Sequence, residues 1–100
     1  MNNTVYQDSI IISSTKLITD WPPRSLADLH LTHLETLYAL TPDLLIIGTG
    51  PQFSRLDHSL IASLDQHKIH YEPMASAAAC RSFMAVLAED RHVVAAILIE

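Results

Sequence analysis

Both glycines of this 100-residue chain fall in one short stretch, Gly48-Thr49-Gly50, which we call the glycine turn. The apolar run Leu44-Leu45-Ile46-Ile47 directly before it is typical of a strand that is buried on both faces of a sheet. A chain without glycine elsewhere needs special backbone freedom here, through either a positive φ or the close approach of another group. Because α/β folds place their ligand crevices at the ends of such strands, the sequence predicts an α/β domain with a candidate cleft at this turn.

Strands and helices are predicted to alternate after residue 42, which indicates a three-layer α/β sandwich. Large apolar residues recur at helical spacing in two segments, and short apolar runs bounded by turn residues mark three strands. A helix between the first two of these strands predicts a parallel βαβ unit. The chain is expected to form one domain over residues 1–100. The expected strands are 43–47, 69–72 and 93–99, and the expected helices are 57–67 and 76–87.

The N-terminal part of the chain predicts two further strands, over residues 9–14 and 17–21. The second of them is stopped by Pro22-Pro23. These two strands are expected to form a separate hairpin or ribbon. The closing strand, 93–99, is either central in the sheet or an edge that pairs with another copy of the chain.

A short helix is predicted between the N-terminal strands and the glycine turn. Thr32 stands three residues before Glu35, which is the spacing of a capping box and predicts a helix from His33 to about Leu40. The following Thr41-Pro42 ends this helix, because the residue before a proline avoids the α region.

The charge balance excludes several classes of partner. The formal net charge is -5 and the six Lys and Arg residues are scattered, which argues against a nucleic-acid binder or a protein that binds anionic membranes.

The longest apolar run, 93–99, is far shorter than a bilayer span requires. The first residues carry neither a basic start nor an apolar core, so we expect no secretory signal and a cytoplasmic location. A single cysteine rules out an internal disulfide.

The glycine turn resembles phosphate-binding loops only in part. The dinucleotide fingerprint requires a third glycine where this chain has Phe53, and the lysine of a P-loop is absent. Pro51 also removes a backbone N–H donor that an anion nest would use. Three alternatives stay open for this turn: a nucleotide site, a site for a small polar or anionic ligand, and a purely structural turn.

Cys80 and Arg81 fall in the first half of the helix predicted over 76–87. A thiol near a helix N-terminus and beside a cation can be nucleophilic, but a free cysteine is also a common buried apolar residue. Arg81 opposes the helix dipole and therefore requires compensation from Asp43 or Glu72, from loop carbonyls or from a bound anion. The six histidines show no metal-ligand spacing, so we expect neither a metal nor a cofactor.

Three segments of the chain, in the same order, resemble the Mth938-like family, also called DUF498. Residues 42–50 are similar to its Pro-x-hydrophobic-Gly-Thr-Gly segment, 74–84 to its Met-Asp-Thr-x-Ala-Ala-Cys-Arg-Thr-Tyr-Asn segment, and 87–96 to its closing segment. The resemblance implies a three-layer α/β fold around a mixed sheet with an N-terminal β extension. It implies no established enzymatic activity, and its mitochondrial members act through protein partners in respiratory-complex assembly.

The chain departs from this family pattern at four positions. Ala75 stands where the family often has Asp, Ser76 where it has Thr, Phe83 where it has Tyr and Met84 where it has Asn. Three of these exchanges remove a polar group, which weakens an acid–base role for the surface.

The sequence therefore predicts a non-catalytic binding or assembly module whose cleft takes a protein partner or a small polar ligand. The alternative is an enzyme with Cys80 as nucleophile or redox thiol and Arg81 holding an anionic substrate. A nucleotide-binding protein is the third possibility, and the oligomeric state stays open. The residues expected to form the cleft are Gly48, Thr49, Gly50, Ser76, Cys80 and Arg81.

Overall fold

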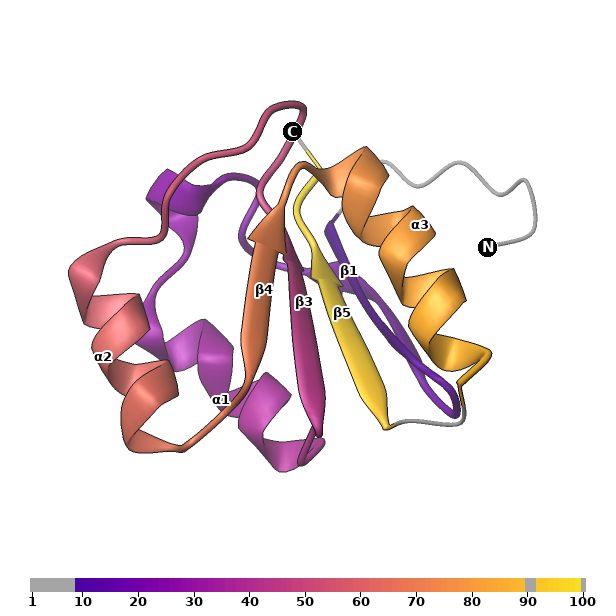
Figure 1. Ribbon diagram of the computed structural model, residues 1–100. Helices are drawn as coiled ribbons and strands as arrows, with labels where there is room; N and C mark the ends of the chain where they lie inside the picture. Colours follow the sequence, from indigo (N-terminus) through magenta and orange to yellow (C-terminus); the bar gives the residue numbers. More distant parts are fainter. Residues whose placement is uncertain (1–8, 90–91, 100) are drawn as a thin grey trace.

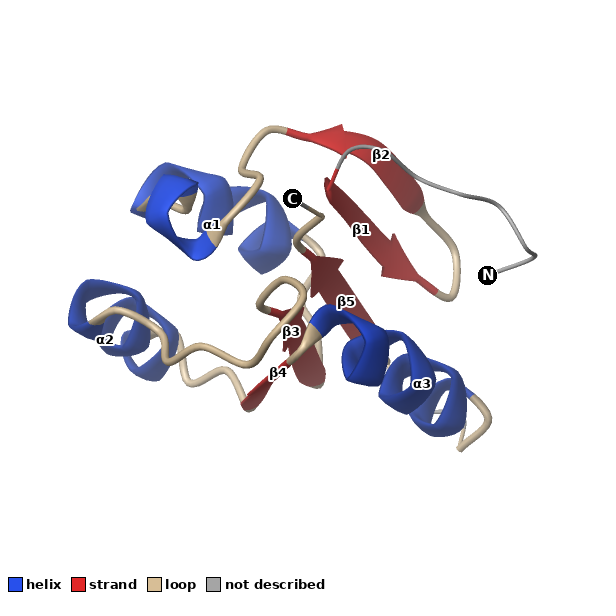
Figure 2. Ribbon diagram, turned by 90° about the horizontal axis from the view of Figure 1, so that it is seen from above, coloured by secondary structure: helices blue, strands red, loops and turns tan. Residues whose placement is uncertain are grey.

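The structure, a computed structural model, describes residues 9–89 and 92–99 of the chain. A mixed five-stranded sheet has helices packed on both of its faces (Figures 1 and 2). This is the three-layer arrangement that the sequence predicts. Along the chain the elements are β1 (Ser9–Ser13), β2 (Leu17–Trp21), the 3-10 helix η1 (Leu26–Asp28), α1 (Leu31–Ala39), β3 (Leu44–Gly48), α2 (His58–Gln66), β4 (Tyr71–Met74), α3 (Ser76–Leu87) and β5 (Val93–Ile97).

The strand order across the sheet is β2-β1-β5-β3-β4. β3 runs parallel to both β5 and β4, which confirms the expected βαβ unit formed with α2. β1 runs antiparallel to β2 and to β5. The closing strand β5 is therefore central, between β1 and β3.

The expectation of a separate N-terminal hairpin was wrong. β1 pairs with β5 from Ile10 opposite Ile97 to Ser13 opposite Val94, so the hairpin extends the main sheet. The physical reason lies in β1 itself, where Ile10 and its neighbour Ile11 point to opposite faces and both are buried. A strand that is apolar on both faces needs the core on each side.

Two apolar clusters cover the two faces of the sheet. On one face, α1 and α2 place large apolar side chains against the sheet, and the most buried of these are Leu34, Leu37, Leu60 and Leu64. On the other face, Ala79 and Phe83 of α3 pack against Leu44, Ile46 and Ala95. The apolar positions of β3 alternate between the two clusters, so this strand is buried from both sides.

The two faces are covered unequally. α1 and α2 lie on one face, while α3 alone packs on the other, mainly over β3 and β5 (Figure 2). On the α3 side, Ile12 of β1 is half-buried and its cross-strand neighbour Leu17 of β2 is 46% exposed. In the described part of the chain, no second helix lies beside α3 over the β1–β2 hairpin.

Helix α1 starts earlier than the sequence predicts. It begins at Leu31, and the backbone N–H of His30 donates a 3.0 Å hydrogen bond to Nδ1 of His33. The expected capping box of Thr32 and Glu35 was wrong, because both residues are already inside the helix. A histidine side chain three residues into the helix supplies the acceptor that the Glu was expected to provide.

Strand β4 is displaced by two residues from its expected position at 69–72. The turn that ends α2 continues as far as Ile69. Lys68 has a φ of 57°, and the N–H of Ile69 still donates to the Leu64 carbonyl oxygen at 3.0 Å. The chain therefore becomes extended only at Tyr71. The remaining strands and helices lie within two residues of their expected bounds.

Candidate functional site

The glycine turn and the start of α3 are hydrogen-bonded to each other. The N–H of Ser76 donates to the carbonyl oxygen of Gly50 at 2.8 Å, and the N–H of Gly50 donates to Oγ of Ser76 at 2.9 Å. Oγ of Ser76 in turn donates to the carbonyl oxygen of Leu98 at 2.7 Å. One hydroxyl thus joins the turn, the start of α3 and the chain just after β5, above the carboxyl ends of the parallel strands (Figure 1).

The two glycines are required for different reasons. A Cβ atom at Gly48 would lie 2.8 Å from Oγ and 3.0 Å from Cα of Ser76, so this glycine lets α3 approach the strand. Gly50 has a φ of 111°, a conformation that L side chains rarely adopt. Both reasons considered from the sequence therefore apply. Gly48 allows the close approach of another group, and Gly50 adopts a positive φ.

The polar groups of the turn are satisfied within the protein. Thr49 is buried, its N–H donates to the carbonyl oxygen of Met74 at 2.8 Å, and its Oγ1 donates to the carbonyl oxygen of Gln52 at 2.9 Å. The same hydroxyl accepts the N–H of Ser54 at 3.1 Å. The N–H and hydroxyl of Thr49 thus fix the loop that follows β3, and both groups are engaged in hydrogen bonds within the protein.

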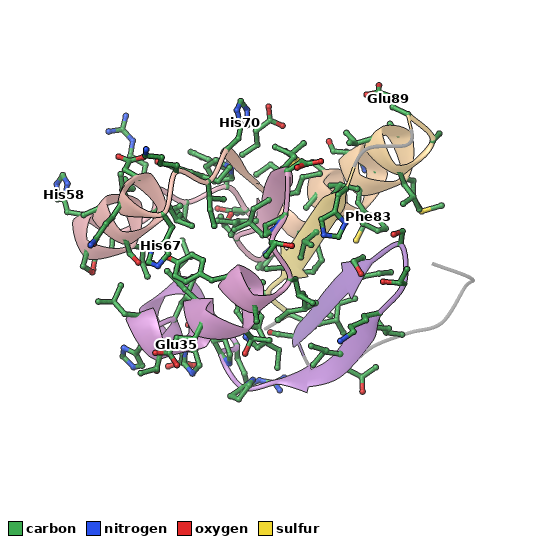
Figure 3. All side chains as sticks on the ribbon, turned by 90° about the horizontal axis from the view of Figure 1, so that it is seen from below. Glu35, His58, His67, His70, Phe83 and Glu89 are labelled. Carbon is green, nitrogen blue, oxygen red and sulfur yellow. The ribbon has the colours of Figure 1, made fainter. Side chains whose placement is uncertain are left out.

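Cys80 and Arg81 lie one turn further along α3 and line a groove between that helix and the sheet. Phe83, which points from α3 toward the strands (Figure 3), is one of the residues that line this groove. The groove has a volume of about 200 Å³, and its lining does not include the glycine turn. We call it the α3 groove, and it is lined by Ile12, Cys80, Arg81, Phe83, Met84, Ala95 and Ile97.

The six residues expected at the site therefore fall into two groups. The glycine turn and Ser76 form a hydrogen-bonded junction, and Cys80 and Arg81 belong to the α3 groove. Sequence reasoning missed the groove's apolar walls on β1 and β5. Two departures from the family pattern could have indicated the groove. At positions 83 and 84, where the family has polar residues, this chain has the apolar Phe83 and Met84, and both line the groove.

Arg81 is exposed at the rim of this groove. Within residues 9–89 and 92–99, no carboxylate forms an ion pair with it, and neither Asp43 nor Glu72 supplies the expected compensation. Helix α3 itself contains no acidic residue.

Cys80 is half-buried, and burial raises the pKa of its thiol above the ordinary value, although the charge of Arg81 acts in the opposite direction. The thiol is therefore protonated near neutral pH, which is unfavourable for a nucleophile.

We expect native Cys80 to react more slowly with iodoacetamide near neutral pH than the unfolded chain, because burial raises the pKa of its thiol and lowers the thiolate fraction. The rate should increase with pH and level off at a higher pH than it does in the unfolded chain. The measurement is carbamidomethylation followed by mass spectrometry across a pH series, with the urea-unfolded chain as control. Native and unfolded chains reacting equally fast near neutral pH would contradict the protecting effect of burial.

Among residues 9–89 and 92–99, no three His, Cys, Asp or Glu side chains gather into a group that could hold a metal ion. None of the helices described in this part of the chain has the length and apolar character needed to traverse a bilayer.

Comparison with known sequences relates the chain to a protein family and to a curated protein. The model of a family described as "Protein of unknown function (DUF498/DUF598)" matches residues 1–98. The chain is also 31% identical over 85 residues to NADH dehydrogenase (ubiquinone) 1 alpha subcomplex assembly factor 3 of Xenopus tropicalis. The match covers 83% of this chain and 46% of that protein, so the chain spans about half the length of this relative.

Solved structures of bacterial proteins share the fold. An NMR structure of a Xanthomonas campestris protein has a TM-score of 0.88 at 30% identity, covering 97% of this chain and 74% of that chain. A crystal structure from Bordetella parapertussis also has a TM-score of 0.88, at 27% identity, covering 99% and 85% of the two chains. A Bordetella pertussis protein described as a Mth938-like domain has a TM-score of 0.80 at 22% identity, covering 97% and 77%.

Proposed function

Because the chain belongs to the DUF498 family and has the Mth938-like fold, we propose that it is a non-catalytic assembly module that binds a protein partner in the α3 groove. The observation that carries this proposal is the apolar character of the groove and its surroundings. Met84 in its wall is 50% exposed, and Leu17 on the neighbouring strand is 46% exposed. Large apolar side chains that remain in water beside a hollow are typical of a protein-interaction surface.

Two features favour a protein partner over a small polar ligand or a substrate. The polar groups of Thr49 and Ser76 are engaged within the fold, so the glycine turn acts as the support that positions α3. The raised pKa of Cys80 leaves the groove without a thiolate near neutral pH. Neither feature supports the alternative of an enzyme based on Cys80 and Arg81.

The curated relative is named as an assembly factor for NADH dehydrogenase, and this name suggests the process in which the module acts. We propose that the partner is a protein involved in the assembly of a respiratory NADH dehydrogenase. An assembly role requires a surface that binds and releases, which suits a groove with one charged residue at its rim better than a wholly apolar interface.

The proposal is tested by deleting the gene in its source cell and restoring it with variants. We expect deletion to lower the amount of assembled NADH dehydrogenase on a native gel, and the unchanged chain to restore it. Met84→Glu, which places a charge in the groove wall, should restore several-fold less.

The matched control is Leu31→Glu, the same kind of exchange at a side chain that is 48% exposed and does not line the groove. It should restore assembly fully. An unchanged amount of assembled enzyme after deletion would reject the assembly role, and equal restoration by Met84→Glu and the unchanged chain would reject the groove.

A further inference from the structure

The sheet is too wide for the single helix that covers its α3 face. Five strands at about 4.8 Å spacing are about 20 Å across, and one helix with its side chains covers about 10 Å. The opposite face meets this requirement with two helices, α1 and α2. Beside α3, over β1 and β2, the described residues supply no second helix (Figure 2). The α3 groove borders this position, because residues of α3, β1 and β5 line it.

We propose that a helix of the partner protein occupies this position, beside α3 and over the β1–β2 hairpin. It is an amphipathic segment that inserts one large apolar side chain into the α3 groove and presents an Asp or Glu to Arg81. This inference rests on the proposed function, because it names the kind of partner segment that the same groove binds.

The size of the groove fits a single anchor residue. Its volume of about 200 Å³ is comparable with the roughly 150 Å³ apolar cavity that binds benzene in an engineered protein. A leucine, methionine or phenylalanine side chain is of this class. The walls that would contact it, Ile12, Phe83 and Ala95, are apolar and come from three different elements. Helices that bind grooves use such anchors on one face.

The charge at the rim specifies a second feature of the partner. Arg81 is exposed and has no ion-pair partner within residues 9–89 and 92–99. A carboxylate on the incoming helix compensates this charge. It also sets the register of that helix along the groove, because the anchor and the carboxylate must be satisfied together.

The same charge argues against a second copy of this chain as the occupant. In a two-fold dimer with α3 packed antiparallel on its counterpart, residues near the helix midpoint face themselves. Arg81 is at that midpoint in the 12-residue helix, and α3 has no acidic residue to neutralise the two arginines. The like charges would oppose the contact.

The experiment is selection from a phage-displayed library of helical peptides of about 18 residues, long enough to form a helix when isolated, with one face randomised. The bait is the full chain, and selection is repeated against Arg81→Glu. We expect the peptides enriched by the unchanged chain to carry an apolar stripe and an Asp or Glu, and to bind Arg81→Glu about tenfold more weakly or worse. Arg81→Glu should enrich Lys or Arg at the same position of the peptide.

Arg55→Glu is the matched control, since Arg55 is also an exposed arginine but lies outside the groove. It should leave the affinity of the selected peptides unchanged. Each peptide is also tested against Met84→Glu, and the bait is examined by analytical ultracentrifugation.

The inference is overturned if no helical peptide is enriched, if enriched peptides bind Arg81→Glu as well as the unchanged chain, or if the bait itself dimerises through the groove. These failures separate from a failure of the proposed function. If the peptides bind Met84→Glu more weakly but bind Arg81→Glu unchanged, the groove is still supported as a binding surface. Only the proposal of a helix that carries an Asp or Glu is then rejected. Peptides indifferent to both variants remove the groove as well.

Discussion

Replacing Gly48 with alanine should lower the free energy of unfolding by about 3 kcal/mol. The added methyl carbon would lie 2.8 Å from Oγ of Ser76, 3.0 Å from its Cα and 3.3 Å from Cβ of Ala79. The contact with Cα involves backbone, so rotating a side chain cannot relieve it. Helix α3 must then move away from β3, which disturbs the packing of Phe83 on the sheet. Urea denaturation followed by circular dichroism measures the change.

The control for Gly48→Ala is Ala77→Ser, a change of similar size at an exposed position of the same helix. It should alter stability by no more than about 0.5 kcal/mol. If Gly48→Ala is as stable as this control, α3 does not approach β3 as closely as described, and the junction between the glycine turn and the helix has to be reconsidered.

Removing the hydroxyl of Ser76 should destabilise the fold by about 2 to 3 kcal/mol. Ser76→Ala leaves two backbone groups without their partner. In the unchanged chain, the N–H of Gly50 donates to Oγ at 2.9 Å, and the carbonyl oxygen of Leu98 accepts from Oγ at 2.7 Å. The cost arises mainly from polar groups left unsatisfied in the partly buried junction. Thermal and urea denaturation should agree on the loss.

Ser59→Ala is the matched control for this prediction. Its hydroxyl donates to Asp57 on the exposed surface, where water replaces the lost bond, so we expect a change of at most about 0.5 kcal/mol. The double variant Gly48→Ala with Ser76→Ala gives a sharper comparison. Because the second change removes the atom closest to the new methyl group, the combined loss should be smaller than the two single losses added together.

The helices and strands whose ends depend on residues adjacent in the sequence were predicted well. Strand β2 ends at Trp21 because Pro22 follows, and α3 spans Ser76–Leu87 as its apolar spacing indicates. The start of α1 and the start of β4 were misplaced, because a histidine supplied the capping acceptor and the end of α2 took up two further residues. Both errors come from hydrogen bonds that composition does not distinguish.

Sequence reasoning predicted only the part of the candidate site that depends on nearby residues, the glycine turn. Two glycines after a buried strand indicated close approach, and the contact between the glycine turn and Ser76 follows from that. The α3 groove was not foreseen, because it requires Ile12 to lie beside Ala95. That neighbourhood depends on which strand pairs with β1, and no pattern within either segment specifies it.

The central position of β5 has a consequence for synthesis of the chain on the ribosome. β5 follows both of its neighbours in the sequence, yet it joins the β1–β2 hairpin to the parallel pair β3–β4. Until residue 97 has emerged, β1 and β3 lack the strand that each pairs with in the complete sheet, and no strand links the two strand pairs. Folding then depends on pairing across almost the whole length of the chain, which is slow and leaves time for chaperones to bind.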